Sequence, residues 1–420
     1  MTSYRTIGLM SGTSLDGVDA ALCRVDLPDA DVPLTEATVE REAFVTDEYE
    51  PSFREYVRSI CDEATTVEEL ARARVAVGRR FARAVEGLLE TADVAPEGVD
   101  LIGSHGQTVW HSPANEPLPA DLGRTRATLQ VGDPSVIARE TGIDTVADFR
   151  SADVAAGGHG APLSPLLDWI QFGRASEDRI VQNIGGIGNC TVLPEGGDWS
   201  TVTAFDTGPG NMVIDAVVER LTDGERQFDE DGRMATAGTV DDDLLTDLLD
   251  DPYLERAPPK STGRERYGDG YATRVLERAR KDGLAADNVV ATVTALTSES
   301  IADAYERHVD LDPDRVVVSG GGAYNETVLS RLEDRLSVPV ETSGKRGIAP
   351  DSREAVLFGL LAALFDADRP GSVPSVTGAS DAAVLGTLAK SSAKVDSPGS
   401  RHSTDDAADR CSRESRNAGE

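Results

Sequence analysis

Four glycine-rich segments, each placed where a strand is expected to end, constrain this fold more than any other feature of the sequence. They are residues 12–19, 183–189, 206–211 and 319–325, and each also carries hydroxyl, amide or carboxylate side chains. Glycine lets backbone N–H groups converge on an anion and admits a positive φ. One such segment alone is better explained as turn geometry, whereas four of them at strand ends favour a nucleotide-binding protein.

The elements around these segments alternate between strand and helix. Strands are expected at residues 5–10, 18–25, 99–103, 179–184, 189–193, 202–206 and 315–319, and helices at residues 67–91, 211–221, 288–309 and 325–336. This order predicts an α/β fold with two successive α/β units, the second beginning after the Gly/Ala/Pro-rich residues 155–165. Ligands of such proteins bind where strands end.

Two common nucleotide-binding classes are excluded. The sequence has no G-x-x-x-x-G-K-[ST] P-loop, and no G-x-G-x-x-G fingerprint opens a helix after the first strand. Residues 185–188 (GGIG) lie between two expected strands, which suits a hairpin loop better than a helix N-terminus. We therefore expect an ATP site made of hairpin loops, one from each domain.

Charge excludes two classes of partner. The chain of 420 residues has 41 Lys+Arg against 74 Asp+Glu, a net charge of −33. Nucleic acids and anionic membranes need Lys and Arg to replace their counterions, so neither is expected as a partner. The same acidity, with lysine rare beside arginine, indicates a halophilic protein adapted to a salty cytoplasm.

Four cysteines, Cys23, Cys61, Cys190 and Cys411, are scattered without CxxC spacing, which predicts neither a zinc cluster nor a disulfide framework. No apolar stretch reaches the length of a membrane span and no signal segment opens the chain, so a cytoplasmic location is expected. Residues 391–420 lack large apolar side chains and are expected to form a disordered polar tail.

Six motifs follow one another within residues 5–390: GLMSGTSLDGVD (8–19), SHGQTVWH (104–111), FRSADVAAGGHGAPL (149–163), QNIGGIGN (182–189), FDTGPGNM (205–212) and SGGGAYN (319–325). In these motifs and their order the chain resembles the anhydro-N-acetylmuramic acid kinases, which belong to the actin, hexokinase and sugar-kinase superfamily. The resemblance implies two ribonuclease-H-like domains around an ATP cleft. It places the N-terminal domain at residues 1–134 plus about 370–390 and the C-terminal domain at residues 135–369.

The resemblance also implies an activity, that of a phosphotransferase with an alcohol acceptor. Such kinases open the 1,6-anhydro ring of anhydro-N-acetylmuramic acid with water and phosphorylate O6 with ATP, giving N-acetylmuramic acid 6-phosphate and ADP. Another 1,6-anhydro sugar such as levoglucosan stays an alternative substrate, and a non-enzymatic actin-like ATP-driven protein is a rival of another class. A homodimer is suggested by the resemblance alone.

Nucleotide-binding residues are carried over by motif. They are Gly12, Thr13, Ser14, Leu15, Asp16, Gly17, Val18 and Asp19 in the first phosphate loop, Gly185 and Gly186 in the second, Gly208, Gly210 and Asn211 in the FDTGPGNM motif, and Gly320 and Gly321 near the adenosine. Phosphoryl transfer is mostly positioning and charge neutralisation, so Mg²⁺ is expected with ATP. Asp16 is the tentative metal residue and Asp206 a weaker one, with turn capping the alternative for both.

Two carboxylates are candidate catalytic residues by the same motif match. Asp153 falls on the catalytic base and Glu354 on a second carboxylate near the substrate. Asp153 also suits a base because it follows Arg150 and precedes the flexible residues 155–160, although a helix cap or an ion pair with Arg150 would explain it as well.

His105, Gln107 and Arg150 are candidate substrate-binding residues. His105 and Gln107 stand at an expected strand end, where they could bind sugar hydroxyls or the lactyl carboxylate of muramic acid. A satisfied core histidine is the alternative for His105, and a surface ion pair the alternative for Arg150.

Overall fold

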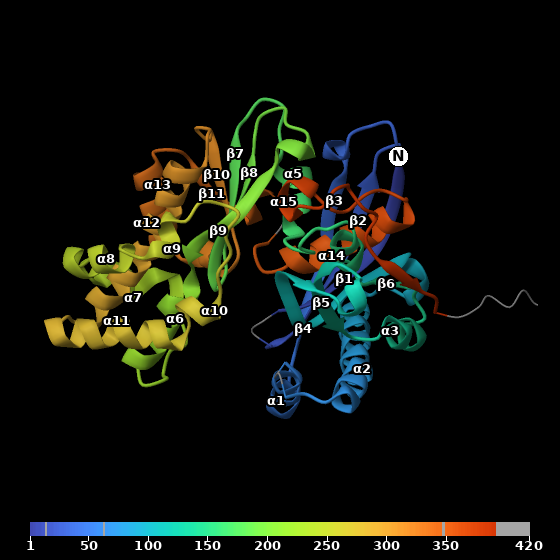
Figure 1. Ribbon diagram of the computed structural model, residues 1–420, viewed down its shortest axis with the longest axis horizontal. Helices are drawn as coiled ribbons and strands as arrows, with labels where there is room; N and C mark the ends of the chain where they lie inside the picture. Colours follow the sequence, from blue (N-terminus) through green and yellow to red (C-terminus); the bar gives the residue numbers. More distant parts are fainter. Residues whose placement is uncertain (13–14, 62–63, 347–348, 392–420) are drawn as a thin grey trace, which may run out of the picture.

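The computed structural model describes residues 1–12, 15–61, 64–346 and 349–391. Thr13, Ser14, Cys411 and the expected tail from residue 392 onward lie outside the described residues. Two β-sheets organise the rest, each with its own helices, and Figure 1 shows them side by side.

The first sheet has seven strands within the described residues and begins with an antiparallel meander. β1 (Thr2–Ser11), β2 (Gly17–Leu27) and β3 (Thr38–Glu48) pair in that order. β4 (Leu101–Pro117) lies parallel to β1 on its other side, and β6 (Thr145–Ala147) lies parallel to β4. β5 (Arg124–Val131) and β12 (Thr387–Ala389) add antiparallel partners to β4 and β6.

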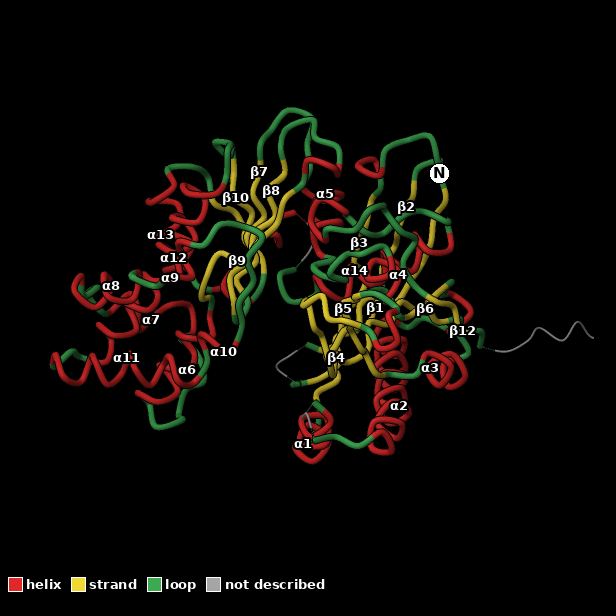
Figure 2. The backbone as a smooth tube through the Cα atoms, in the orientation of Figure 1, coloured by secondary structure: helices red, strands yellow, loops and turns green. Residues whose placement is uncertain are grey.

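The second sheet repeats this plan with five strands in the part of the chain that the structure describes. β7 (Arg179–Ile184), β8 (Ile187–Leu193) and β9 (Thr203–Pro209) form the antiparallel meander. β10 (Arg315–Ser319) lies parallel to β7, and β11 (Val340–Thr342) parallel to β10. Three antiparallel strands followed by two parallel ones is the ribonuclease-H-like order, so the expected pair of such domains is confirmed (Figure 2).

Helices cover the sheets. On the first sheet these are α2 (Val67–Ala92) and α3 (Pro134–Thr141), and on the second α6 (Asn211–Leu221), α12 (Ala286–His308) and α13 (Glu326–Leu336), while α11 (Asp269–Asp282) packs on α6. The shorter helices are α1 (Pro51–Ile60), α4 (Ser151–Ala155), α7 (Arg233–Ala237), α8 (Asp242–Leu249), α9 (Pro252–Glu255), α10 (Arg264–Tyr267) and α15 (Pro374–Thr377). Among the described residues, no helix has the length and apolar content needed to cross a membrane.

Two helices, α5 (Ser164–Phe172) and α14 (Arg353–Asp366), join the sheets. Their apolar residues share one core cluster with side chains of both sheets. α14 packs on β1, β2 and β4, and a Cβ on Gly8 or Gly103 would collide with its backbone. The two glycines therefore permit this close approach.

The observed packing corrects the expected domain boundaries. β6 and α14 fall within residues 135–369, yet both belong to the first sheet and its packing. The reason is that the chain returns from β11 to the first sheet through α14. No local pattern in the sequence predicts this return.

Candidate active site

The first glycine-rich loop joins β1 to β2. Thr13 and Ser14 lie outside the described residues. The side chains of Leu15 and Val18 are buried in the core of the first sheet, so these residues have only backbone groups to offer a nucleotide. Leu15 has a φ of +55°, and Tyr49 N donates to Asp16 O at 2.7 Å, which fixes the loop against the end of β3.

The second glycine-rich loop joins β7 to β8 at the equivalent place in the other sheet. Its carbonyls hold the start of α6, because Asn211 N donates to Gly185 O at 2.8 Å and Met212 N to Gly186 O at 3.1 Å. Gly210 N donates to the same Gly186 oxygen at 3.1 Å. The loop and the FDTGPGNM motif therefore form one unit.

The fourth glycine-rich segment meets this unit. Gly320 has a φ of +76°, and a Cβ there would lie 2.6 Å from Asn183 Oδ1 and 2.7 Å from Ile184 O. A Cβ on Gly321 would lie 3.2 Å from Asn211 Nδ2. Three of the four segments thus converge at the N-terminus of α6, a place suited to binding an anion.

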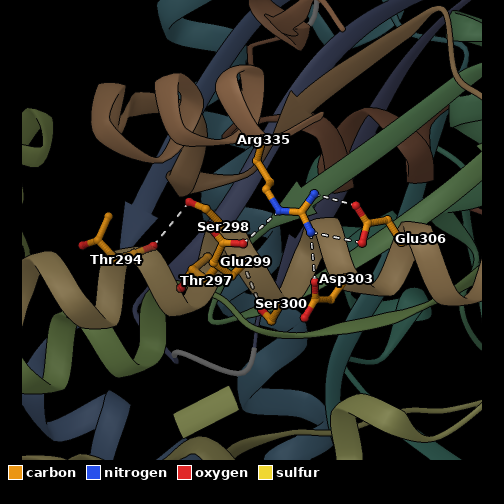
Figure 3. A network of polar contacts seen from close by, with 8 residues as sticks. All are labelled: Thr294, Thr297, Ser298, Glu299, Ser300, Asp303, Glu306 and Arg335. Carbon is orange, nitrogen blue, oxygen red and sulfur yellow. Dashed lines mark hydrogen bonds and ion pairs between the residues drawn. The ribbon is translucent and has the colours of Figure 1, made fainter. Parts of the chain in front are cut away.

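Helix α12 supports this convergence from behind. Thr297 Oγ1 donates to Gly210 O at 3.2 Å, and a Cβ on Gly208 would lie 3.1 Å from Ser300 Oγ. Figure 3 shows that α12 is in turn held by Arg335 of α13, whose guanidinium meets three carboxylates. Their shortest distances to it are 3.1 Å for Glu299, 3.3 Å for Asp303 and 2.5 Å for Glu306.

Asp153 lies in α4 and is fully buried, with 0% of its surface exposed. Its Oδ1 accepts from Thr377 Oγ1 at 2.7 Å, and its Oδ2 from Gly160 N at 2.7 Å. A Cβ on Gly158 would collide with this carboxylate. Residues 157–160 therefore cover Asp153 closely.

Buried His105 and partly buried Arg150 form a pair next to Asp153. Arg150 Nε donates to His105 Nε2 at 2.9 Å, while His105 Nδ1 lies 3.0 Å from Gly106 O. A carbonyl can only accept, so Nδ1 carries the proton and the imidazole is neutral. Burial, followed by the charge of Arg150, holds the pKa of His105 well below its usual value.

Gln107 is also buried, with 1% of its surface exposed. Its Oε1 accepts from Ser11 Oγ at 2.7 Å, and Ser11 Oγ accepts from Tyr49 OH at 3.1 Å. This chain ties the middle of β4 to the end of β1, so His105 and Gln107 lie within a long strand and not at the expected strand end. His105 and Gln107 are thus both bonded within the protein, and their contact with a sugar stays a prediction.

Glu354 stands in the first turn of α14 with an exposed side chain. Surrounding protein still desolvates the carboxyl and raises its pKa, while Arg353 and Arg150 oppose the rise. Burial, opposed by Glu354 and Asp153, lowers the pKa of Arg150 to about 10. Arg150 therefore lies within electrostatic reach of both candidate catalytic carboxylates.

Asp19 brings the first glycine-rich loop into the same neighbourhood. Burial raises its pKa to about 6; the hydrogen bond from Thr46 opposes the rise, and the charges of Asp16, Glu354 and Asp351 add to it. Charge thus links the β1–β2 hairpin to Glu354, Glu354 to Arg150, and Arg150 to Asp153.

No group of three or more His, Cys, Asp or Glu side chains is placed to hold a metal ion in the described ranges. Asp206 instead fixes a neighbouring loop, because its Oδ2 accepts from Thr262 N at 2.9 Å. Asp16 is exposed at the first loop, so its link to Mg²⁺ stays a prediction.

Comparison with known proteins agrees with this geometry. The family model for anhydro-N-acetylmuramic acid kinase matches residues 4–391. The chain belongs to this family. It is 45% identical over 391 residues to the anhydro-N-acetylmuramic acid kinase of Salinibacter ruber, covering 92% of this chain and 96% of that one. The kinase of Caldanaerobacter subterraneus subsp. tengcongensis is 43% identical over 387 residues, covering 91% and 96%.

A looser likeness exists among solved structures. The Acidaminococcus fermentans (R)-2-hydroxyglutaryl-CoA dehydratase component A has a TM-score of 0.44 and 13% identity, covering 86% of this chain and 98% of that one. At that level the likeness says nothing about the chemistry of this anhydro-N-acetylmuramic acid kinase family member.

The structure of this family member adds residues that sequence reasoning missed. Thr377 and Gly160 hold Asp153, and Arg353 forms a buried ion pair with Asp168. Thr377 is 224 residues away from its partner, and Asp168 is 185 residues from Arg353. Of these residues, only Gly160 could have been found from the sequence, because it lies inside the motif at residues 149–163 that also contains Asp153.

Proposed function

We propose that this chain is an ATP-dependent kinase that hydrolyses the 1,6-anhydro bond of anhydro-N-acetylmuramic acid and phosphorylates O6. Family membership supports the reaction. The observation that carries the proposal is the position of Arg150, whose Nη1 donates to Gly160 O at 2.6 Å while Gly160 N donates to Asp153 Oδ2 at 2.7 Å. The charge of Glu354 acts on both Arg150 and Asp19, so a sugar bound at Asp153 would lie near the first phosphate loop.

The chemistry balances as follows. Water attacks the anomeric carbon and its proton passes to Asp153, while the C1–O6 bond breaks and O6 takes the electron pair. O6 then attacks the γ-phosphate and ADP leaves. A positioned base contributes about 10²- to 10⁴-fold to such a step.

Asp153 fits the base role in orientation. Thr377 and Gly160 donate to its two oxygens and so fix the direction in which the carboxylate faces. Because residues 157–160 cover the carboxylate, this segment has to shift for a water molecule to reach it. Gly157 and Gly160, with φ of +83° and +72°, are the residues that would accommodate the shift.

Nucleotide phosphates would be held by the backbone of the two hairpin loops and by the N-terminus of α6. Glycine is needed at positions 210 and 320, because a Cβ at either would collide with the backbone of the β7–β8 loop or of the strand that leads into it. When bound, Mg²⁺ neutralises phosphate charge. Asp16 and Asp19, at the first loop, are the side chains that would hold its water shell.

The test is ADP release in molar KCl with Mg²⁺-ATP, with Asp153→Asn as the control for background hydrolysis. We expect turnover with 1,6-anhydro-N-acetylmuramic acid that Asp153→Asn abolishes. Turnover with levoglucosan alone would move the substrate to a neutral anhydro sugar. ATP hydrolysis indifferent to any sugar would favour the actin-like rival.

A further inference from the structure

A group of basic side chains lies at the segment that covers Asp153, although the chain as a whole has a net charge of −33. The group is His111 on β4, Arg126 on β5, Arg150 at the start of α4, and His159 in the segment that covers Asp153. Arg150 is already bonded to His105 and Gly160 O. Of the other three, His111 is exposed, and Arg126 and His159 are half-buried.

The β4–β5 hairpin places His111 and Arg126 on one face. His111 is paired with Thr128 across the hairpin, and its Nδ1 lies 3.1 Å from Thr128 Oγ1. Arg126 is two residues from Thr128 along β5, and side chains two apart on a strand point to the same face.

Arg126 also crosses to the segment that covers Asp153. Its Nη1 donates to Gly157 O at 2.7 Å. His159 lies two residues further along this segment and is fixed by its backbone N–H, which donates to Thr377 O at 2.9 Å. Thr377 is the residue that also bonds Asp153. The hairpin and the covering segment thus bring the three basic groups to the edge of the catalytic carboxylate.

These groups influence one another. Burial, then the charges of Arg150 and His159, lowers the pKa of His111. Burial, then Arg126, lowers the pKa of His159, while Asp153 opposes the change. Both imidazoles are therefore neutral near pH 7, where each can donate one N–H to an anion that lies beside the charged guanidinium of Arg126.

We propose that His111, Arg126 and His159 bind the carboxylate of an acidic substituent on the sugar, the lactyl ether group of a muramic acid derivative, and so select it over neutral anhydro sugars. This inference rests on the proposed function and assigns the specificity of its sugar site. An ATP phosphate is the other anion in the reaction. It is the less suitable ligand, because three of the four glycine-rich segments gather at the start of α6, away from the β4–β5 hairpin.

The test compares two substrates that differ in the lactyl group alone: 1,6-anhydro-N-acetylmuramic acid and 1,6-anhydro-N-acetylglucosamine. Steady-state constants are measured for the wild type, His111→Gln, Arg126→Gln and Arg126→Lys, each first checked for folding by its melting temperature. The control is Arg79→Gln, which removes the same charge from α2, where Arg79 pairs with Glu140 at 3.3 Å.

We expect His111→Gln and Arg126→Gln each to lower kcat/KM for the acidic sugar about tenfold or more, the scale of a charge-assisted hydrogen bond. The loss falls on the KM of that sugar, with the neutral sugar and the KM of ATP unchanged. Arg126→Lys recovers part of the loss, and Arg79→Gln matches the wild type.

Equal losses for both sugars, or a raised KM for ATP, would overturn the inference, the latter by identifying the group as a phosphate site. A wild type that uses both sugars equally well would also overturn it while leaving the kinase function in place. A wild type that turns over neither sugar would contradict the proposed function itself.

Discussion

Arg353 at the start of α14 and Asp168 in α5 form an ion pair at the junction of the two sheets, with 7% and 2% of their side chains exposed. Arg353 Nη1 also donates to Ser319 Oγ at 2.9 Å, and Asp168 Oδ2 accepts from Thr191 Oγ1 at 2.7 Å. Ser319 and Thr191 belong to the second sheet, whereas α14 packs on the first. The pair therefore fixes the helix that carries Glu354 against the strand that leads into Gly320.

Removing one partner of this pair should destabilise the protein strongly. Asp168→Asn leaves the buried guanidinium of Arg353 without its anion, a change that typically costs about 3–5 kcal/mol. Urea unfolding at pH 7 measures the loss. The double variant Asp168→Leu with Arg353→Met should recover most of it.

Arg335→Met is the matched control, because Arg335 is also bound by carboxylates but is one-third exposed (Figure 3). Exposed ion pairs contribute about 0–1 kcal/mol, so a much smaller loss is expected. An equal loss of unfolding free energy in Asp168→Asn and Arg335→Met would show that the Arg353–Asp168 pair contributes no more to stability than an exposed ion pair.

Replacing the proposed base should separate chemistry from binding. Asp153→Asn keeps the shape of the side chain but cannot accept the proton of water, so kcat should fall about 10²- to 10⁴-fold. The dissociation constant for ATP, measured by calorimetry, should stay within about twofold because the nucleotide loops are untouched. A variant with near-normal kcat would remove Asp153 from this role.

A methyl group at position 320 should disrupt the nucleotide site. Gly320→Ala forces a Cβ to 2.6 Å from Asn183 Oδ1 at a positive φ, so the segment must move away from the β7–β8 loop. We expect ATP to bind more than about tenfold more weakly in calorimetry. Gly87→Ala, in open space on α2, is the control and should stabilise the protein slightly. Unchanged ATP affinity in Gly320→Ala would contradict the assignment of this segment.

The carboxyl of Asp215 on α6 should make stability fall as pH rises. Burial raises its pKa to about 7 in the folded state, from an ordinary value of 3.8. Between these two values the folded state keeps a proton that the unfolded state has lost, so the free energy of unfolding decreases with pH across this window.

Asp215→Asn removes this dependence. It should be about 1–3 kcal/mol more stable than the wild type at pH 8, and the advantage should disappear near pH 4. Urea unfolding across this range gives the comparison, with the exposed Asp334→Asn as control. A gain that does not change with pH would refute the explanation.

Much of the local structure could be predicted from the sequence. The strand at residues 179–184, the helix at 211–221 and the strand at 315–319 occur at the expected positions, because apolar periodicity and glycine punctuation determine them locally. β4 is longer than expected, reaching Pro117, because its second half pairs with β5 in a hairpin that local patterning did not reveal.

The sequence predicted which residues form the candidate site, but not which hydrogen-bond partners they have. The motifs pointed to Asp153, Arg150 and His105, but not to the bond from Arg150 to His105 or to the donation from Thr377 to Asp153. Those contacts join elements that are distant in sequence, and a single sequence carries no record of which distant residues meet.

By itself, then, the sequence determined the family, because the chain carries the six motifs in the family's order. It also determined the two α/β units and the glycine-rich segments, because short-range sterics and hydrophobic periodicity specify these. The tertiary structure alone decided that α14 returns to the first sheet, that Arg353 meets Asp168, and that Arg126 reaches the segment that covers Asp153. These features depend on how whole faces of sheets and helices pack, and packing is a property of the complete chain.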